Sequence, residues 1–310
     1  MTRSSPPGGS EPSSLRRRLV ALLRHRVVRV VGTIAGLGLL ALALAAVVTQ
    51  RDALDAAWKS LARPEPLLVL GLLGAIVGNL LLTAGVFGCL IRRFPTDTAK
   101  VGRLEMVELI GASTLINFVP MKPGLFGRIA WHRVVNHIPA VNSARTILES
   151  VGLSMACAAA IVVALLAAHR WQLPLVVPLS VPAVVLLTLM VPGFTRPFAM
   201  AGLCRFVDLL LWGARYFIAF QLIGQPISPT TALAVAIGST AASLVPLAGN
   251  GLGLREWTTG VLTPLLSDQT LHVALTAELV NRAGELLVVV PLGLASIAGL
   301  LRRRAAATRR

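Results

Sequence analysis

Three cationic residues stand beside interruptions in apolar stretches of the chain. Lys122 and Arg128 accompany the segment 120–124, which reads Pro-Met-Lys-Pro-Gly, and Arg255 follows the glycine-rich segment 249–253. A helix that begins after such an interruption has free N–H groups that favour an anion. Arginine adds paired hydrogen bonds that match phosphate oxygens. The residue types therefore predict two phosphate-binding turns.

The glycines of the two turns belong to the same prediction, because they let a ligand approach the backbone. The alternative is that Arg128 extends to the membrane surface and that Arg255 only pairs with Glu256. The candidate head-group contacts are Lys122, Gly124, Gly127, Arg128, Gly251, Gly253 and Arg255.

Further charged residues follow each interruption at helical spacing. Arg145 and Glu149 lie four residues apart, and Glu278, Arg282 and Glu285 lie four and three apart, so each set shares a helical face. One hypothesis is a set of internal ion pairs that also includes Glu256. The other is a proton or cation relay coupled to transport. Charges inside a membrane segment are costly in either case.

Other chemistries lack the residue patterns they need. Cys89, Cys157 and Cys204 form no Cys-x-x-Cys pair, and the histidines show no metal-ligand spacing. We find no Ser-His-Asp order and no glycine-rich nucleotide loop. We therefore expect no metal, no cofactor and no enzymatic activity.

The elements that must position these residues are apolar helices. Of the 310 residues, 55% are hydrophobic and 14% are charged, against about a quarter charged in soluble domains. Uncharged or nearly uncharged runs of about 20 residues predict membrane crossings. We expect an all-α, polytopic transmembrane helix bundle with about six full crossings, at 30–50, 67–91, 150–168, 171–195, 206–224 and 271–301.

The net charge of +16 follows from arginines clustered between these runs, which argues against nucleic-acid binding. Their distribution favours cytoplasmic loops and both termini in the cytoplasm. The chain then divides into a disordered basic cytoplasmic tail at 1–26, a transmembrane domain at 27–301 and a basic cytoplasmic tail at 302–310. We expect a multi-pass protein of the cytoplasmic (inner) membrane.

Two stretches, 104–138 and 231–267, are broken near their middle by proline and glycine. Such breaks survive at membrane depth only where protein or water satisfies the backbone. We predict two re-entrant helical hairpins, the alternative being two further crossings joined by a tight turn. The stretches resemble each other, and the crossing at 171–195 would invert the second. This predicts an inverted repeat of about 67–168 and 206–301, unless the likeness arose by chance.

These motifs resemble the lysylphosphatidylglycerol synthase transmembrane-region family, whose members are flippase-like integral membrane proteins. The resemblance covers roughly 67–301, and Asn250 stands where the family often has glycine. It implies a domain that moves a modified phospholipid or a polyprenyl-linked lipid between leaflets. The matching residues are Pro120, Gly124, Gly127 and Arg128, then Gly251, Gly253, Arg255 and Glu256, then Arg282 and Glu285.

Family members that also synthesise the lipid carry a soluble aminoacyl-transferase domain, which we do not expect here. The leading expectation is a flippase-like transporter whose partner is a membrane phospholipid or lipid-linked substrate. One alternative is a non-transporting accessory subunit of a lipid or glycan biosynthesis enzyme. Another is a membrane-embedded transferase with Glu149 or Glu285 as its base. A membrane-protein partner or a homo-oligomer is compatible with each.

Overall fold

The computed structural model describes residues 65–94, 101–119, 122–190, 196–244 and 249–308, together with the isolated residues 34, 38, 41, 42 and 45. Within these ranges the regular secondary structure is helical, with no strand. The predicted tail at 1–26 and the crossing at 30–50, apart from those isolated positions, lie outside the described residues.

Four helices are long and apolar enough to cross a membrane. They contain 26 to 38 residues, whereas a crossing needs about 20. This confirms the membrane class and the helical character of four predicted crossings. The helices are α4 (Pro66–Ile91), α7 (Ala140–Trp171), α9 (Arg196–Leu222) and α12 (Leu271–Thr308).

The stretch 171–195 differs from its prediction as a full crossing. Trp171 is the last residue of α7, which ends because Gln172 takes a left-handed conformation. The helix that follows, α8 (Val176–Thr188), has 13 residues and measures about 20 Å. That length is shorter than the hydrocarbon core of about 30 Å.

Both interrupted stretches form pairs of short helices. The first pair is α5 (Arg103–Ile116) with α6 (Pro123–Val134), and the second is α10 (Pro229–Leu244) with α11 (Leu254–Leu266). The members of each pair pack against each other, and none exceeds 16 residues. The predicted interruptions are therefore confirmed.

The backbone at both breaks takes left-handed conformations. Lys122 has φ 48° immediately before α6, and Asn250 has φ 47° in the short 3-10 helix η1 (Gly249–Gly251). Gly251 and Gly253 follow with φ 72° and 79°. Asparagine and glycine tolerate this region, whereas a left-handed lysine is held there by its surroundings.

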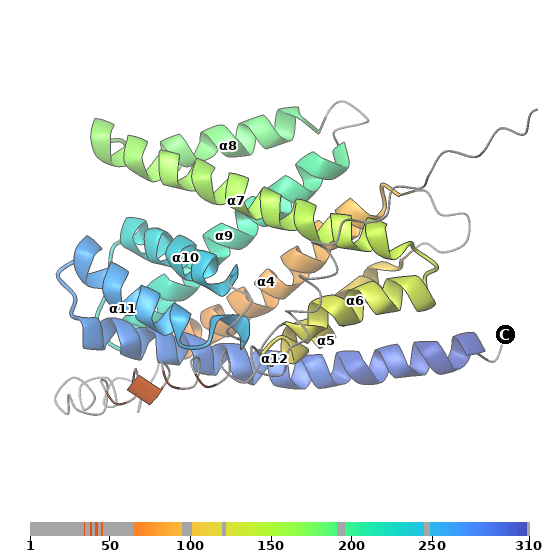
Figure 1. The fold of residues 1–310 in the computed structure, drawn as a ribbon. Coiled ribbons are helices and arrows are strands. Elements are labelled where there is room, and N and C mark those ends of the chain that lie inside the picture. The colour runs from red at the N-terminus through yellow and green to blue at the C-terminus, as the bar shows by residue number, and fades with distance from the viewer. Residues whose placement is uncertain are drawn as a thin grey trace, which may run out of the picture.

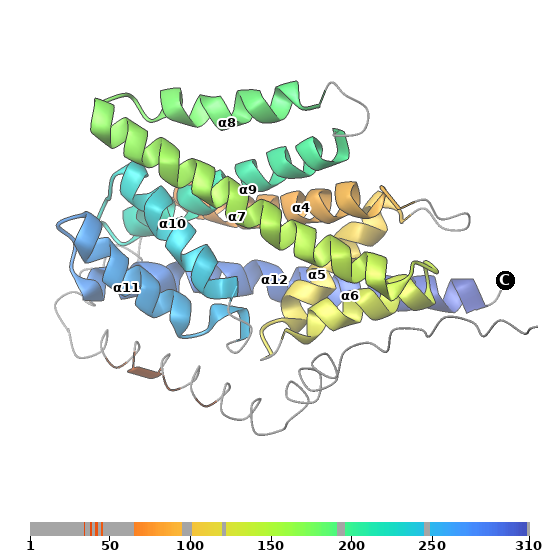
Figure 2. The ribbon, with the colours of Figure 1, turned by 45° about the horizontal axis from the view of Figure 1, so that its top comes forward.

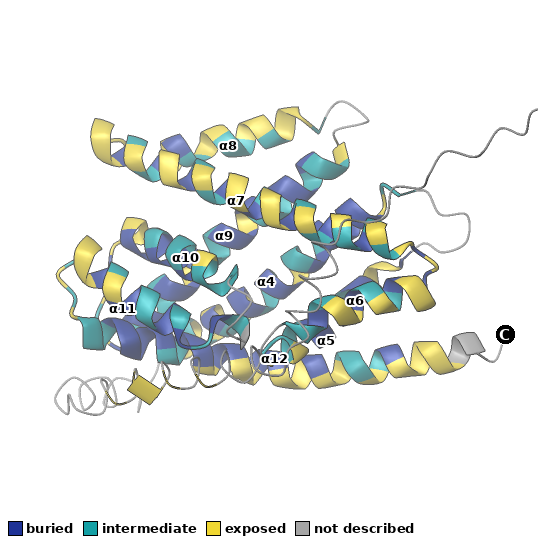
Figure 3. Cartoon of the chain, viewed as in Figure 1, coloured by how far each residue is buried: buried dark blue, intermediate teal, exposed yellow. Residues whose placement is uncertain are grey.

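The long helices form the centre of the bundle (Figures 1 and 2). Helices α4 and α9 pack along each other, and α12 runs beside both. The first pair contacts the C-terminal half of α12, where Leu115 lies beside Gly293, and the second pair contacts its start, where Leu275 lies beside Gly260. Helix α8 is outermost, beyond α7, and much of its surface is exposed (Figure 3).

Candidate functional site

The two breaks meet inside the bundle. The Nζ atom of Lys122, in the first break, donates a hydrogen bond to the carbonyl oxygen of Ser243, at the end of α10, at 2.5 Å. On α12, Arg282 donates to the carbonyl oxygen of Asn250 at 3.2 and 3.3 Å. Its guanidinium also lies 5.4 Å from the ring of Phe118. Arg282 therefore contacts both breaks at once.

Glycine allows each break to fold back on its own pair. A Cβ atom on Gly124 would lie 2.2 Å from the carbonyl oxygen of Ser113, which no real contact permits. A Cβ atom on Gly251 would lie 3.0 Å from the Cα atom of Ser243. Gly127, in contrast, has nothing within 4 Å of that position. The close approach thus explains Gly124 and Gly251 but not Gly127.

Behind the meeting point lies a buried set of charges, named here the arginine–carboxylate cluster. It consists of Arg215, Arg255, Arg282, Glu256, Glu278 and Glu285, each at most 6% exposed. In its centre, Arg255 is 2.8 Å from Glu285 through Nη1 and 3.0 Å from Glu278 through Nη2. The helix that begins at Leu271 thus forms ion pairs through Glu278, Arg282 and Glu285. The partners of Arg255 are Glu278 and Glu285 rather than Glu256.

Glu285 binds more of the cluster than any other described carboxylate. Its Oε2 atom lies 2.8 Å from Arg255, 3.5 Å from Arg215 and 3.7 Å from Arg282. Its Oε1 atom accepts a hydrogen bond from Asn250 at 2.9 Å. Glu285 therefore ties the second break to α9, α11 and α12.

Glu256 is the exception in the cluster. It is fully buried, and neither carboxylate oxygen accepts a hydrogen bond within the described part of the chain. Its ion pair is with the Nε atom of Arg282, at 3.5 Å. A carboxylate held this loosely is the group in the cluster that can take up a proton with the least disturbance of hydrogen bonds.

Neutral side chains that were not predicted complete the cluster. The ring of Trp212 lies 3.9 Å from the guanidinium of Arg215 and 4.8 Å from that of Arg255. Ser239 accepts from the Nε atom of Arg255 at 3.3 Å and from Tyr216 at 2.5 Å. Only the three-residue spacing of Trp212 and Arg215 gave a signal for this arrangement, because the other contacts join separate helices.

Asn79 connects the cluster to a further ion pair. It donates to Asp208 at 2.8 Å and accepts from Arg215 at 3.3 Å. Asp208 in turn pairs with Arg205 at 2.7 Å. The connected interior thus holds four arginines and four carboxylates, so their formal charges cancel. The members are Arg205, Arg215, Arg255, Arg282, Asp208, Glu256, Glu278 and Glu285.

Arg128 is different, because it is buried without a counter-charge. Its side chain on α6 is 6% exposed, and its guanidinium lies 4.1 Å from the ring of Phe87 on α4. Among the described residues no carboxylate pairs with it, and its Nε and Nη1 atoms have no hydrogen-bond partner. The alternative that Arg128 extends to the membrane surface is therefore wrong. Arg128 lines a cavity of only about 10 Å³ together with Ser143 and Thr146 of α7, so an anion larger than a water reaches its donors only when these helices move apart.

The remaining predicted ion pair lies near the start of α7. Arg145 donates to Glu149 at 2.9 Å, and Glu149 also accepts from Arg93, which follows α4. This confirms the predicted pairing of Arg145 with Glu149 and adds Arg93, whose guanidinium stacks over Phe198 at 3.8 Å. Because Glu149 holds two arginines, its carboxylate acts as a link between α4 and α7.

The predicted phosphate contacts therefore separate into two places. Lys122, Gly251 and Gly253 lie at or beside the meeting of the breaks, with Arg255 in the cluster behind it. Arg128 faces α4 and α7 on the other side of the first pair. Of the two predicted arginines, Arg128 is the one that forms no ion pair with a carboxylate among the described residues.

No protein-family model, no curated protein and no solved structure matches the chain.

Proposed function

We propose that this protein is a flippase-like lipid transporter that moves an anionic or modified phospholipid, or a polyprenyl-phosphate-linked lipid, between the leaflets of the cytoplasmic membrane. The observation that carries the proposal is the contact between the two breaks at Arg282. In transporters with broken helices, substrate sites lie where such breaks meet near the middle of the membrane.

The directions of the two pairs support a re-entrant, inverted arrangement. The α5–α6 pair approaches the meeting point from the end of the bundle where α12 finishes, and the α10–α11 pair approaches from the end where α12 begins (Figure 1). Each pair therefore opens toward a different side. Motion of one pair against the other would expose the meeting point to each side in turn.

Arg128 and Arg255 have different roles in this proposal, because their ion pairing differs. Among the described residues Arg128 has no counter-charge and two donors without a hydrogen-bond partner, so it binds the phosphate first. Arg255 is held by Glu278 and Glu285, so it reaches a phosphate only if that phosphate replaces a carboxylate. The cluster then acts as a set of exchangeable partners that keeps the path neutral, and Glu256 is the group that would carry a coupled proton.

The test is a leaflet-resolved assay in vesicles that contain fluorescent phosphatidylglycerol. We expect the chain to accelerate transfer over protein-free vesicles, and Arg128→Gln to slow it about 10- to 100-fold, the equivalent of hydrogen bonds to a charged group. The matched control is Arg133→Gln, on the same helix but exposed, which should retain the wild-type rate. A wild-type rate equal to that of protein-free vesicles would refute the proposal.

A further inference from the structure

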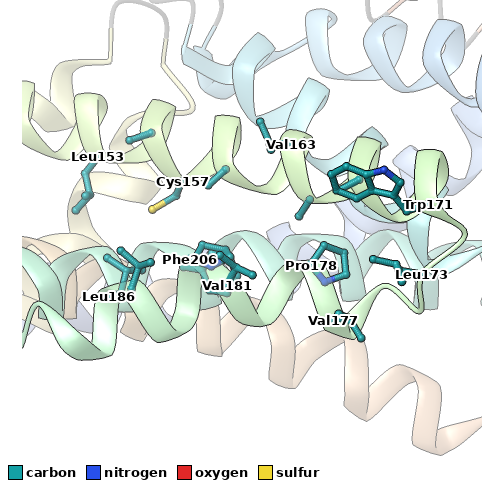
Figure 4. A pocket seen from close by; sticks show the side chains of 16 residues that line it. Leu153, Cys157, Val163, Trp171, Leu173, Val177, Pro178, Val181, Leu186 and Phe206 are labelled. Carbon is teal, nitrogen blue, oxygen red and sulfur yellow. The ribbon is translucent and has the colours of Figure 1, made fainter.

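A long apolar groove runs between α7 and α8. Its volume is about 590 Å³, within the range of about 300–1,000 Å³ that is usual for ligand sites. Side chains of both helices line it, together with Phe206 of α9 (Figure 4). No side chain of the lining is charged. The labelled members include Leu153, Cys157, Trp171, Val181, Leu186 and Phe206.

Hydrocarbon is the occupant that this lining admits. The face of α7 is made mainly of small residues, including Ala160 and Ala164, and α8 faces it with Pro178 and Pro182. In membranes such small residues usually bring helices into close contact, but here a groove remains between the two helices. Water does not stabilise a gap that offers it no polar partners. An empty gap would lose the dispersion contacts of its walls.

One end of the groove lies beside an arginine that has a hydrogen-bond donor without a partner in the described chain. Phe206 follows Arg205, whose Nη2 atom donates to Ser150 at 3.1 Å, one turn before Leu153. The Nε atom of Arg205 has no hydrogen-bond partner in the described chain. Arg128 lines a small cavity with Thr146, which lies one turn of α7 before Ser150. Arg205 is paired with Asp208 through Nη1, so an anionic group placed there would accept from its Nε atom and from the unpaired donors of Arg128.

We propose that the groove binds one acyl chain of an anionic phospholipid whose phosphate lies at Arg128 and Arg205. From Leu153 to Trp171 the groove follows α7 for about 27 Å, which is long enough for a whole acyl chain. As the loading position of a transporter, this site rests on the proposed function, but the binding itself requires no movement between leaflets.

The experiment uses the full chain in phosphatidylcholine vesicles that contain phosphatidylglycerol with a photoactivatable diazirine on one acyl chain. After illumination, peptide mapping should find much more label on the groove residues of α7 and α8 than on residues of the outward face of α7. Ala160→Phe, which fills the groove, should lower this label about tenfold. Ala159→Phe, a neighbouring substitution on an exposed position of α7, should leave it unchanged.

Two comparisons of the wild-type chain keep the test independent of how the variants fold. A phosphatidylcholine probe with the same diazirine chain should label the groove several-fold less than phosphatidylglycerol. Equal labelling of the groove by both probes would overturn the proposal, because the groove would then hold ordinary surrounding lipid. Equal labelling of the groove and of the outward face of α7 would overturn it for the same reason. Cross-links between α8 and the chain's own residues 30–50 would also overturn it, because that segment would then fill the groove.

The outcomes separate this site from the proposed function. Specific groove labelling without lipid transfer in the leaflet assay would retain the acyl-chain site and refute the transporter. Lipid transfer without groove labelling would retain the transporter and refute the acyl-chain site.

Discussion

The two breaks have similar sequences but different electrostatic surroundings. Each has small residues, a proline, a glycine turn and then an arginine. Arg128 rests against the ring of Phe87 with no carboxylate among its described partners, whereas Arg255 lies between Glu278 and Glu285. The difference teaches that the motif alone does not decide what its arginine does. The facing helix decides whether the arginine forms ion pairs that join helices or is buried without a counter-charge.

The physical reason lies in the cost of burying charge. A buried ion that loses its partner is strongly destabilised, and a pair is tolerated only with good geometry and hydrogen bonds. Arg255 meets that condition within the protein. Among the described residues Arg128 has only the aromatic face of Phe87, a contact that contributes on the order of 2 kcal/mol when desolvated, so its remaining stabilisation must come from a ligand or water.

The largest expected effect on stability is at the second break, where Arg255 is held by ion pairs. Glu285→Gln removes the carboxylate that pairs with Arg215, Arg255 and Arg282, so it should lower the free energy of unfolding by about 3–5 kcal/mol. Chemical denaturation in detergent micelles measures this. Glu256→Gln is the matched control and should cost much less, because its oxygens accept no hydrogen bond among the described residues. Equal losses would show that geometry does not distinguish the two carboxylates.

The two arginines should respond in opposite directions. Arg255→Gln leaves Glu278 without its ion-pair partner and should destabilise the protein by about 3 kcal/mol. Arg128→Gln removes an uncompensated buried charge, so without lipid its stability should equal or exceed that of the wild type. Thermal unfolding of both variants in delipidated micelles measures the contrast. A loss of thermal stability in Arg128→Gln as large as that in Arg255→Gln would contradict the conclusion that Arg128 is buried without a counter-charge.

The turn of the first break offers a smaller test. Gly124→Ala places a methyl group against the backbone of Ser113, and overpacking of this kind costs about 1–3 kcal/mol. Gly127→Ala meets nothing within 4 Å and lies inside α6, where alanine is favoured over glycine by about 0.5–1 kcal/mol. Thermal unfolding should therefore separate the two substitutions in sign. Similar thermal stabilities of the two variants would mean that Gly124 does not pack tightly against the backbone of Ser113.

The smallest effect is expected at the edge of the bundle. Arg303 pairs with Glu108 at 2.5 Å, and its side chain is 40% exposed. Exposed pairs contribute about 0.2–1 kcal/mol, so Arg303→Ala should change stability by less than about 1 kcal/mol. Added salt should reduce even that difference. A loss as large as that of Glu285→Gln would mean that the outer pair, too, is structurally essential.

The sequence by itself determined the class of the protein and the location of its breaks. Long, mostly apolar runs cannot face water, so α4, α7, α9 and α12 follow from their apolar length, although α9 and α12 also carry buried charges. The interruptions follow from proline and glycine, which act locally. The ion pair between Arg145 and Glu149 was predictable for the same reason, because four residues along one helix fix the distance.

Only the tertiary structure decided which charges pair between helices. Arg255 and Glu285 are thirty positions apart, and Arg128 meets Phe87 across a longer separation. No local rule selects such partners, because they depend on how whole helices pack. The shortening of α8 and the apolar groove beside it have the same origin. Sequence fixes what a short segment can do alone, whereas burial and charge compensation belong to the assembled bundle.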